Sequence, residues 1–257
     1  MRPLAALGAD EARRLVAVAT DLDDTVLDHG RLGVAAFSAL SALARAGLPV
    51  IVATGRPLGW AEVVARTWPI AAALAENGAC AAVNVGTRTV RRTLASVDRP
   101  RLEALRAEIL ATFPEISATD DAHLRETDAT FDVGEYAAPP REVVEGVVAL
   151  ARARGAVVTI SSVHLHVSFS PADKASGIVW VARALFGLDE TTARARVAFV
   201  GDSGNDAAAF SAFRATFGVA NVRAHLQALT VPPRFVAEAP RGEGFAEIAR
   251  ALLQARG

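Results

Sequence analysis

The sequence lacks the cysteines of a disulfide framework. Cys80 is the only cysteine among 257 residues, so the chain can form neither an internal disulfide nor a thiolate metal cluster. Nothing in the composition therefore requires an oxidising compartment, and we expect the protein in the cytoplasm.

Long apolar runs and an excess of charge of one sign are also missing. No run approaches the roughly 18 to 20 residues that span a bilayer, and the first ten residues have no apolar stretch typical of a signal peptide. The chain carries 27 basic and 28 acidic residues, so no overall field attracts nucleic acid or an anionic membrane. We expect neither as a partner, and any anion must bind in a local pocket.

Lysine is almost absent. Of the 27 basic residues only Lys174 is a lysine, and all the others are arginines. A lysine kept among so many arginines indicates a position where the planar guanidinium group cannot serve. Chance retention of one lysine is the alternative.

What the sequence does contain is enough apolar side chain to fold. Hydrophobic residues make up 52% of the chain and charged residues 21%, which excludes disorder, collagen and coiled coil. The length allows one large domain or two modest ones.

Strands and helices alternate in the first third of the chain and again in the last third. Short apolar runs at 15–19, 48–53 and 70–75 are typical of buried strands, with helical patterns at 33–46 and 58–67 between them. A helix at 174–186, a strand at 197–200, a strand near 217–219 and later helices resume the alternation. This order predicts an α/β fold with a Rossmann-like parallel sheet and helices on both faces.

The middle of the chain breaks this alternation. Residues 82–85 and 89–94 flank a Gly-Thr turn and predict a β-hairpin. After it come helices at 99–112 and 141–154, strands at 156–161 and 163–169, and an irregular or strand segment at 130–133. We therefore predict an inserted α+β cap domain at 82–170 and a core domain formed by 1–81 and 171–257.

Polar clusters follow three of the predicted parallel strands. They are Asp21 with Asp23, Thr54-Gly55-Arg56, and Gly201-Asp202-Ser203-Gly204-Asn205-Asp206. Because the carboxyl ends of parallel strands form one crevice, these segments can converge. Four aspartates pressed together would repel one another unless a cation such as Mg²⁺ neutralised them, and Lys174 would add positive charge for a phosphate.

The clusters resemble, in order and spacing, the four motifs of the haloacid dehalogenase (HAD) superfamily. Glu76-Asn77-Gly78-Ala79 before the long insert is similar to the IIB, Cof-like branch, whose cap is an α/β lid over the active site. Two positions depart from the branch. Asp24 stands where glycine is common and adds a charge beside the site, and Ala209-Phe210 stands where methionine is common.

The resemblance implies a role for each core residue. Asp21 would be the nucleophile that forms an aspartyl-phosphate, and Asp23 the general acid and base, with its carbonyl as a metal ligand. The remaining implied roles are metal binding for Asp21, Asp23, Asp202 and Asp206, phosphate binding for Thr54, Gly55, Lys174 and Asn205, and orientation of the catalytic Lys174 by Asn205 and Asp206. The implied cofactor is Mg²⁺.

Substrate specificity has weaker candidates. Arg56 would either reach the substrate or pair with a surface acid. His164 and His166 alternate with apolar residues in 163–169, so they face either the leaving group, where they would bind sugar hydroxyls, or solvent. Arg125 and Asp128 are further candidates for the same surface.

These expectations combine into a Mg²⁺-dependent phosphatase that hydrolyses a small phosphorylated metabolite, a sugar or polyol phosphate, through an aspartyl-phosphate. A phosphomutase of the same fold is the alternative, since it would use the same intermediate. A signalling module that holds phosphate on Asp21 is disfavoured by Asp23, which would shorten the lifetime of the phosphoryl group. Monomer and homodimer are both open.

Overall fold

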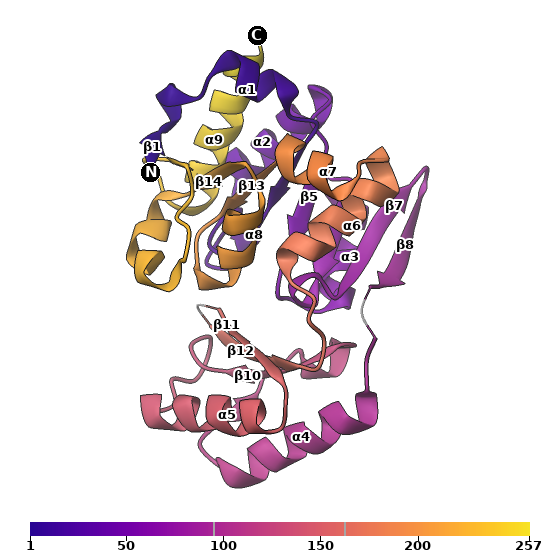
Figure 1. Ribbon diagram of the computed structural model, residues 1–257, viewed down its shortest axis with the longest axis vertical. Helices are drawn as coiled ribbons and strands as arrows, with labels where there is room; N and C mark the ends of the chain where they lie inside the picture. Colours follow the sequence, from indigo (N-terminus) through magenta and orange to yellow (C-terminus); the bar gives the residue numbers. More distant parts are fainter. Residues whose placement is uncertain (95, 162) are drawn as a thin grey trace.

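The computed structural model describes residues 1–94, 96–161 and 163–257. It has two parts stacked along the long axis of the molecule. The larger part is the α/β core, and the smaller part, the cap, contains the helices α4 and α5 and lies below the core in Figure 1. The chain leaves the larger part once and returns to it once. The predicted α/β core with an inserted α+β unit is confirmed.

The larger part is built on a nine-stranded sheet. Its strands lie in the order β1 (Arg2–Pro3), β15 (Phe235–Val236), β14 (Ala215–Gly218), β13 (Val197–Gly201), β2 (Ala17–Thr20), β5 (Val50–Ala53), β6 (Ala72–Ala75), β7 (Cys80–Val85) and β8 (Arg88–Thr93). The pairs from β1 to β6 are parallel. Every residue of the central strands β2, β5, β6, β13 and β14 is buried, which explains why their sequences are mostly apolar.

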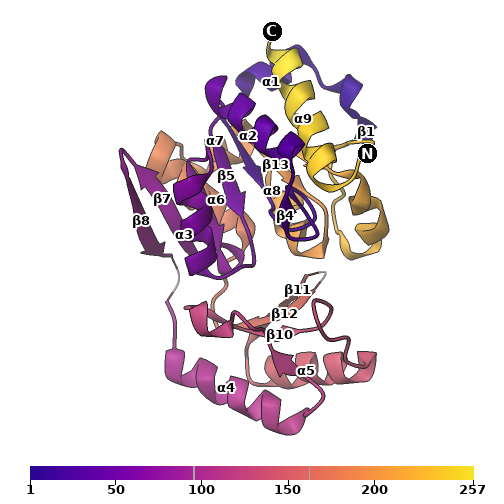
Figure 2. The same ribbon diagram turned by 180° about the vertical axis from the view of Figure 1, so that it is seen from behind.

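Helices cover both faces of this sheet. On one face, α2 (Val34–Arg45), α3 (Leu58–Thr67) and α9 (Arg241–Arg256) pack on Val18, Val50 and Val52, with α1 (Ala9–Arg14) against α9. On the other, α6 (Lys174–Phe186), α7 (Glu190–Arg196) and α8 (Ala207–Ala212) pack on Ala19 and Ile51. The layer of α6, α7 and α8 faces the viewer in Figure 1, and the layer of α2, α3 and α9 in Figure 2. Successive strand residues thus serve opposite cores, as the pleat of a strand requires.

The hairpin β7–β8 lies elsewhere than predicted. It extends the large sheet, since β7 pairs antiparallel with β6 and β8 with β7. The turn between β6 and β7 is the short 3₁₀ helix η2 (Glu76–Gly78), which folds β7 straight back along β6. Cys80 and Ala82 then fill one core and Ala81 and Val83 the other. We therefore propose that the chain divides after β8, and not at residue 82.

The smaller part is an antiparallel sheet covered on one side by helices. The strands lie in the order β11 (Val157–Ile160), β12 (His164–Ser168), β10 (Asp128–Asp132) and β9 (Ser117–Ala118). The helices α4 (Arg99–Thr112) and α5 (Arg141–Ala153) pack on Leu165 and Val167. The opposite face of the sheet is turned toward the larger part (Figure 2). The predicted alternation is confirmed for Leu165, Val167 and Phe169, which pack on the helices. It is wrong for Val163, which precedes β12 and lies beside His164 and His166 on the other face.

Short elements complete the chain. They are η1 (Leu4–Ala6), the hairpin β3 (Leu27–Asp28) and β4 (Arg31–Leu32), η3 (Ala122–Leu124), η4 (Gly204–Asp206) and η5 (Ala220–Ala228). Across the described ranges, no helix is both long enough and apolar enough to cross a membrane.

Candidate active site

Three neighbouring parallel strands deliver the polar clusters to one edge of the large sheet. β2 lies between β13 and β5, with Thr20 opposite Val200 on one side and Val52 on the other. The residues that follow these strands therefore emerge side by side: Asp21 after β2, Asp202 after β13 and Thr54 after β5. The convergence that the sequence predicts is present.

Lys174 joins two of the aspartates. Asp173 caps the N-terminus of α6 by accepting the backbone N–H of Ser176, so Lys174 is the first residue of the helix. Its Nζ atom donates to Oδ1 of Asp21 at 2.5 Å and to Oδ1 of Asp206 at 2.7 Å, and its side chain is fully buried. Burial alone would lower the pKa of Lys174, but the carboxylates of Asp206 and Asp21 hold this pKa above its ordinary value. The lysine is therefore charged.

Negative charge exceeds positive charge at this point. Asp21, Asp202 and Asp206 each place a carboxylate oxygen within 4.8 Å of the others. Burial is the main cause that raises the pKa of Asp21 to about 7, against the attraction of Lys174 and with further repulsion from Asp206 and Asp23. Burial, with the charges of Asp21 and Asp206, raises the pKa of Asp202 to about 9. A divalent cation held by oxygen ligands would remove this repulsion, so the residues fit Mg²⁺.

Asp206 also shapes the loop that carries Asp202. Its Oδ2 atom accepts the backbone N–H of Asp202 at 2.8 Å and of Ser203 at 3.1 Å. Gly201 permits this turn, because a Cβ atom there would collide with the Asp206 carboxylate. In this structure Asp206 thus fixes both the loop and Lys174.

Asp23 contacts a different cation. Arg56 Nε lies 2.9 and 3.0 Å from the two carboxylate oxygens of Asp23, and Arg56 Nη2 lies 2.7 Å from Oδ1. The guanidinium group also lies over the ring of Trp60, 4.6 Å from its centre. Neither expectation for Arg56 foresaw this partner, which is an acid of the site itself.

Thr54, Gly55 and Asn205 also reach this edge of the sheet. The hydroxyl of Thr54 accepts the backbone N–H of Arg56 at 3.0 Å, and Oδ1 of Asn205 accepts the hydroxyl of Ser203 at 2.8 Å. A Cβ atom on Gly55 would lie 3.0 Å from Cε1 of His166. The glycine therefore allows the smaller part to approach the core closely.

A small cavity lies where the two parts meet. It is lined by Asp21, Asp23, Gly55, Arg56, Ser161, Val163, His164, His166, Ser203 and Asn205, and its volume is about 20 Å³. That volume holds about one water molecule. A sugar phosphate is far larger, so the smaller part must move away from the core before such a substrate can enter.

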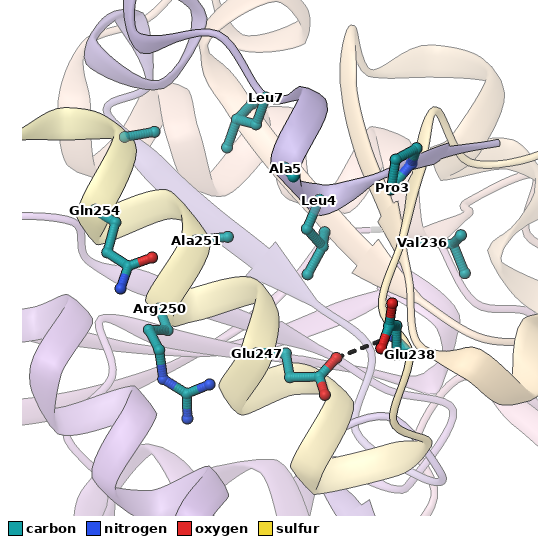
Figure 3. Close-up of a pocket in the computed structure, with 11 residues that line it drawn as sticks. Pro3, Leu4, Ala5, Leu7, Val236, Glu238, Glu247, Arg250, Ala251 and Gln254 are labelled. Atoms are coloured by element: carbon teal, nitrogen blue, oxygen red, sulfur yellow. Dashed lines mark hydrogen bonds between the residues drawn. The ribbon is translucent and has the colours of Figure 1, made fainter.

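A wider hollow lies outside this region. It has a volume of about 580 Å³ between the N-terminal segment and α9 (Figure 3). Its lining includes the carboxylate of Glu247, which accepts the backbone N–H groups of Glu238 and Ala239. The lining contains no residue of the four motifs, so size alone does not mark the site.

The cap histidines face the cavity and not solvent. His164 and His166 are each only 4% exposed. Nε2 of His164 lies 2.6 Å from Glu135, and Nδ1 of His166 lies 2.9 Å from Asp128. Burial lowers the pKa of His166, against the opposing charge of Asp128. Because a carboxylate only accepts hydrogen bonds, Nδ1 of the neutral ring carries the proton and Nε2 keeps a free lone pair.

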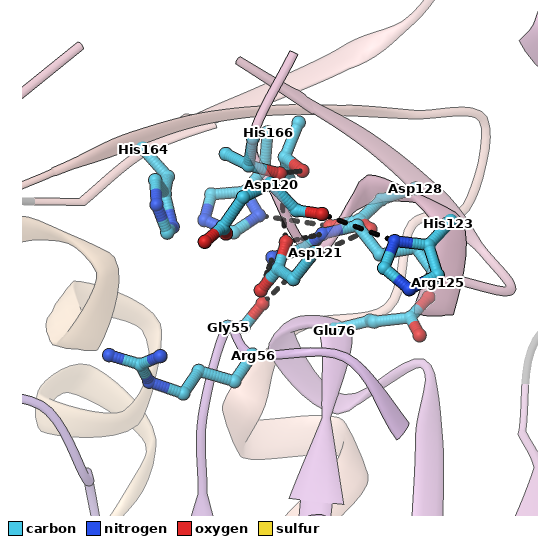
Figure 4. A network of polar contacts seen from close by, with 12 residues as sticks. Gly55, Arg56, Glu76, Asp120, Asp121, His123, Arg125, Asp128, His164 and His166 are labelled. Carbon is cyan, nitrogen blue, oxygen red and sulfur yellow. Dashed lines mark hydrogen bonds and ion pairs between the residues drawn. The ribbon is translucent and has the colours of Figure 1, made fainter. Parts of the chain in front are cut away.

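Arg125 and Asp128 support His166 from behind. Arg125 Nη1 donates to Asp128 at 3.1 Å and to the carbonyl oxygen of Gly55 at 2.9 Å, and Nε donates to Asp121 at 3.1 Å (Figure 4). Among the described residues that line the cavity, neither Arg125 nor Asp128 appears. Both therefore act on the cavity through His166 and Gly55.

Two residues with prominent contacts had no assigned role in the sequence. Glu76, 3% exposed, accepts the backbone N–H of Leu58, Glu126 and Thr127 and the hydroxyl of Thr127, so it joins core and cap. Asn221 donates to Asp202 at 2.8 Å. Their positions in the sequence could have indicated a role, because residues that follow parallel strands lie at the same edge of the sheet. Glu76 directly follows β6, and Asn221 comes three residues after β14.

Comparison with known proteins places the chain in a phosphatase family. The sequence matches the family described as sucrose-6F-phosphate phosphohydrolase over residues 14–250. A search of curated proteins finds no significant match.

Several solved structures share the fold. A Thermoplasma acidophilum protein is 19% identical, with a TM-score of 0.74 over 93% of this chain and 99% of that one. The sucrose-phosphatase from Synechocystis sp. PCC6803, solved with sucrose and phosphate, is 16% identical, with a TM-score of 0.66 over 93% and 98%. The HAD subclass IIB sugar phosphatase BT4131 is 16% identical, with a TM-score of 0.65 over the same shares. With a family match over most of its length, the chain belongs to the sucrose-6F-phosphate phosphohydrolase family of phosphoric monoester hydrolases, and it shares the fold of the solved HAD subclass IIB sugar phosphatase.

Proposed function

We propose that the protein is a Mg²⁺-dependent phosphatase that hydrolyses a sugar phosphate through an aspartyl-phosphate at Asp21. The observation that carries this proposal is the buried contact of Lys174 with Asp21 and Asp206 beside Asp202. A buried ammonium group among carboxylates creates a place where a phosphoryl group and a divalent cation can be held together.

The metal would be held by the carboxylates of Asp21 and Asp202 and by the carbonyl of Asp23, with Asp206 and Asn205 beside them. When bound, Mg²⁺ would neutralise the acidic cluster and the charge of the phosphoryl oxygens. Lys174 would bind a phosphoryl oxygen, and Thr54 with the amide of Gly55 would bind the others. Asp206 keeps Lys174 in place for this role.

The chain's own residues supply the two chemical steps. A carboxylate oxygen of Asp21 attacks phosphorus, the bond from phosphorus to the sugar oxygen breaks, and that oxygen takes a proton from Asp23. Water then attacks the phosphorus of the aspartyl-phosphate and gives a proton to Asp23. The bond from phosphorus to Asp21 breaks, so inorganic phosphate is released and Asp21 is restored. Arg56 donates to both carboxylate oxygens of Asp23 in this structure, and we propose that it moves away when the sugar phosphate binds.

The substrate class rests on the family and on the cap. The family is described by sucrose 6F-phosphate hydrolysis, and two structural neighbours are a sucrose-phosphatase and a sugar phosphatase. The free lone pair on Nε2 of His166 can accept a hydrogen bond from a sugar hydroxyl. His164, held by Glu135, would bind a second hydroxyl. A cytoplasmic location and a monomeric or dimeric state remain predictions from the sequence.

One assay tests the proposal. Release of inorganic phosphate would be measured from sucrose 6F-phosphate, trehalose 6-phosphate, glucose 6-phosphate, a polyol phosphate, a nucleotide and a glycerate phosphate, each with Mg²⁺ and with EDTA. We expect a sugar phosphate to give the highest kcat/KM and EDTA to abolish release. Equal release with EDTA would contradict the metal, and preference for the nucleotide would contradict the substrate class. A requirement for a sugar bisphosphate would indicate a phosphomutase.

A further inference from the structure

The side chain of Asn221 joins the acidic cluster to two other segments of the core. Its Nδ2 atom donates to Oδ2 of Asp202 at 2.8 Å and to the carbonyl oxygen of Asp24 at 3.0 Å. Its Oδ1 atom accepts the backbone N–H of Arg241 at 3.1 Å. Asn221 thus connects η5, the loop after β2 and the first turn of α9.

The chemistry of these partners fixes the orientation of the amide. A backbone N–H can only donate, so the oxygen of Asn221 must face Arg241. The NH₂ group then faces a carbonyl and a carboxylate, which only accept. An acceptor at one end and two donors at the other are the property of a primary amide, so aspartate, serine or alanine cannot replace all three bonds.

The two segments that Asn221 holds have unusual backbone conformations. Asp24 has a φ of 54° and Arg241 a φ of 49°, in the left-handed region that residues other than glycine rarely adopt. Nε of Arg241 donates to Oδ1 of Asp24 at 3.0 Å. The sequence predicts that Asp24 adds a negative charge beside the site and indicates no partner for it. In the structure this charge is paired with Arg241.

Both oxygens of Asp202 have a donor. Thr25 donates its hydroxyl to Oδ1 at 3.1 Å, and Asn221 donates to Oδ2. Two donors on opposite oxygens prevent rotation of the carboxylate, and groups that hold a ligand in this way raise metal affinity. Asp202 is 2% exposed, so water cannot easily replace a lost donor.

We infer that Asn221 is a positioning residue that fixes the carboxylate of Asp202 for a divalent cation, and that Arg241 and Asp24 fix Asn221. The inference rests on the proposed metal site. It means that residues of η5 and α9, which lie outside the four motifs, contribute to metal affinity.

The test compares two asparagines with equal numbers of hydrogen bonds. Asn84 donates to the carbonyl oxygens of Ala65 and Ile70 and accepts the hydroxyl of Thr89, within the larger part but outside the acidic cluster. Mg²⁺ affinity of the full chain would be measured by isothermal titration calorimetry for the wild type, Asn221→Ala, Asn221→Ser and Asn84→Ala. Circular dichroism would verify that each variant is folded.

We expect both Asn221 variants to bind Mg²⁺ about 10- to 100-fold more weakly than the wild type. Asn84→Ala should lower the melting temperature and leave Mg²⁺ affinity unchanged. Saturating Mg²⁺ should restore most of the kcat of the Asn221 variants, because the reacting groups are intact.

Three results would overturn the inference. Folded Asn221 variants with wild-type Mg²⁺ affinity would refute it alone and leave the proposed function standing. Failure of both Asn221 variants to fold would make the residue structural. A wild-type protein that binds no Mg²⁺ would remove the proposed metal site and this inference with it.

Discussion

The core edge and the cap face both bury charged groups, but they differ in charge balance. At the core edge, Asp21, Asp202 and Asp206 lie together while one lysine contacts Asp21 and Asp206, and the pKa values of Asp21 and Asp202 are raised. On the cap face, burial alone would raise the pKa of Asp128, yet Arg125 and then His166 hold this pKa below its ordinary value. On the cap face Asp128 accepts hydrogen bonds from the guanidinium group of Arg125 and from His166. At the core edge the hydrogen bonds of Asp202 come from the neutral groups of Thr25 and Asn221. This difference separates the core cluster, which would bind a cation and a phosphate, from the cap cluster, which holds the ring of His166 in place.

The largest effect is expected at the unbalanced cluster. Asp21→Asn should lower kcat by roughly 10³-fold or more, because a carboxamide is not a nucleophile and binds Mg²⁺ poorly. Phosphate release from the best sugar phosphate is the measurement. The exposed Asp10→Asn is the control, with expected wild-type activity. Activity of Asp21→Asn within about tenfold of wild type would refute the nucleophile.

Lys174 tests whether charge alone is enough. Lys174→Arg should be nearly as damaging to kcat as Lys174→Ala, because the side chain is fully buried between Asp21 and Asp206 and a planar fork does not fit there. Lys174→Ala should also be less stable, since removal of one partner from a buried ion pair costs about 3 to 5 kcal/mol. Urea unfolding would measure this loss. Full activity of Lys174→Arg would make the single lysine a coincidence.

Removal of one acid should change the need for metal. Asp202→Ala should raise the Mg²⁺ concentration for half-maximal activity by at least about tenfold, with a smaller change in KM for the sugar phosphate. A titration of activity with Mg²⁺ at saturating substrate measures the first quantity. Unchanged metal dependence would show that Asp202 does not bind the cation.

The cap histidines should affect substrate selectivity more than the chemical step. His164→Ala and His166→Ala should each lower kcat/KM for the best sugar phosphate by about tenfold, the effect of a hydrogen bond worth about 1.4 kcal/mol. Neither variant should change kcat/KM for p-nitrophenyl phosphate, which has no sugar hydroxyls. Equal losses on both substrates would refute a role in sugar recognition.

The smallest effect concerns stability against pH. The folded-state pKa of His166 lies below its ordinary value of 6.5, so protonation favours the unfolded chain. The contribution of His166 to the free energy of unfolding should therefore fall as the pH drops below about 6.5 toward the folded-state pKa. Asp21 and Asp202, whose pKa values are raised, contribute with the opposite sign, so the test is the difference between the wild type and the variant. His166→Asn should reduce this slope in urea unfolding measured at several pH values, whereas exposed His123→Asn should keep it. Equal slopes in the wild type and His166→Asn would contradict the buried neutral ring.

The sequence predicted the core more completely than the cap. Short buried strands ending in polar residues specify both a parallel sheet and its ligand edge, so Asp21, Thr54 and Asp202 converge as expected. The hairpin β7–β8 could not be assigned to a sheet, because hairpin patterning does not encode which neighbour a strand pairs with. The short elements β1, α1, α7 and β15 were not predicted, since none has enough residues to show a period.

Side-chain partners were the least predictable. Arg56 with Asp23, Glu76 with Thr127 and Asn221 with Asp202 join residues 33, 51 and 19 positions apart. Such pairs depend on tertiary packing that no local pattern records. The alternation of residues predicted that His164 and His166 lie on one face of the strand, but it left open whether that face meets the core or solvent. Only the position of the cap on the core determines that the face is buried.

The cavity of about 20 Å³ also has a kinetic meaning. A closed enzyme captures substrate only from the fraction of molecules whose cap is open, so its apparent dissociation constant is the intrinsic one divided by that fraction. Product escapes only when the cap opens again, so opening can limit turnover even where hydrolysis is fast. Variants that weaken the bonds between Glu76 and the cap should then bind substrate more tightly in apparent terms, at the cost of weaker protection of the proposed aspartyl-phosphate from bulk water.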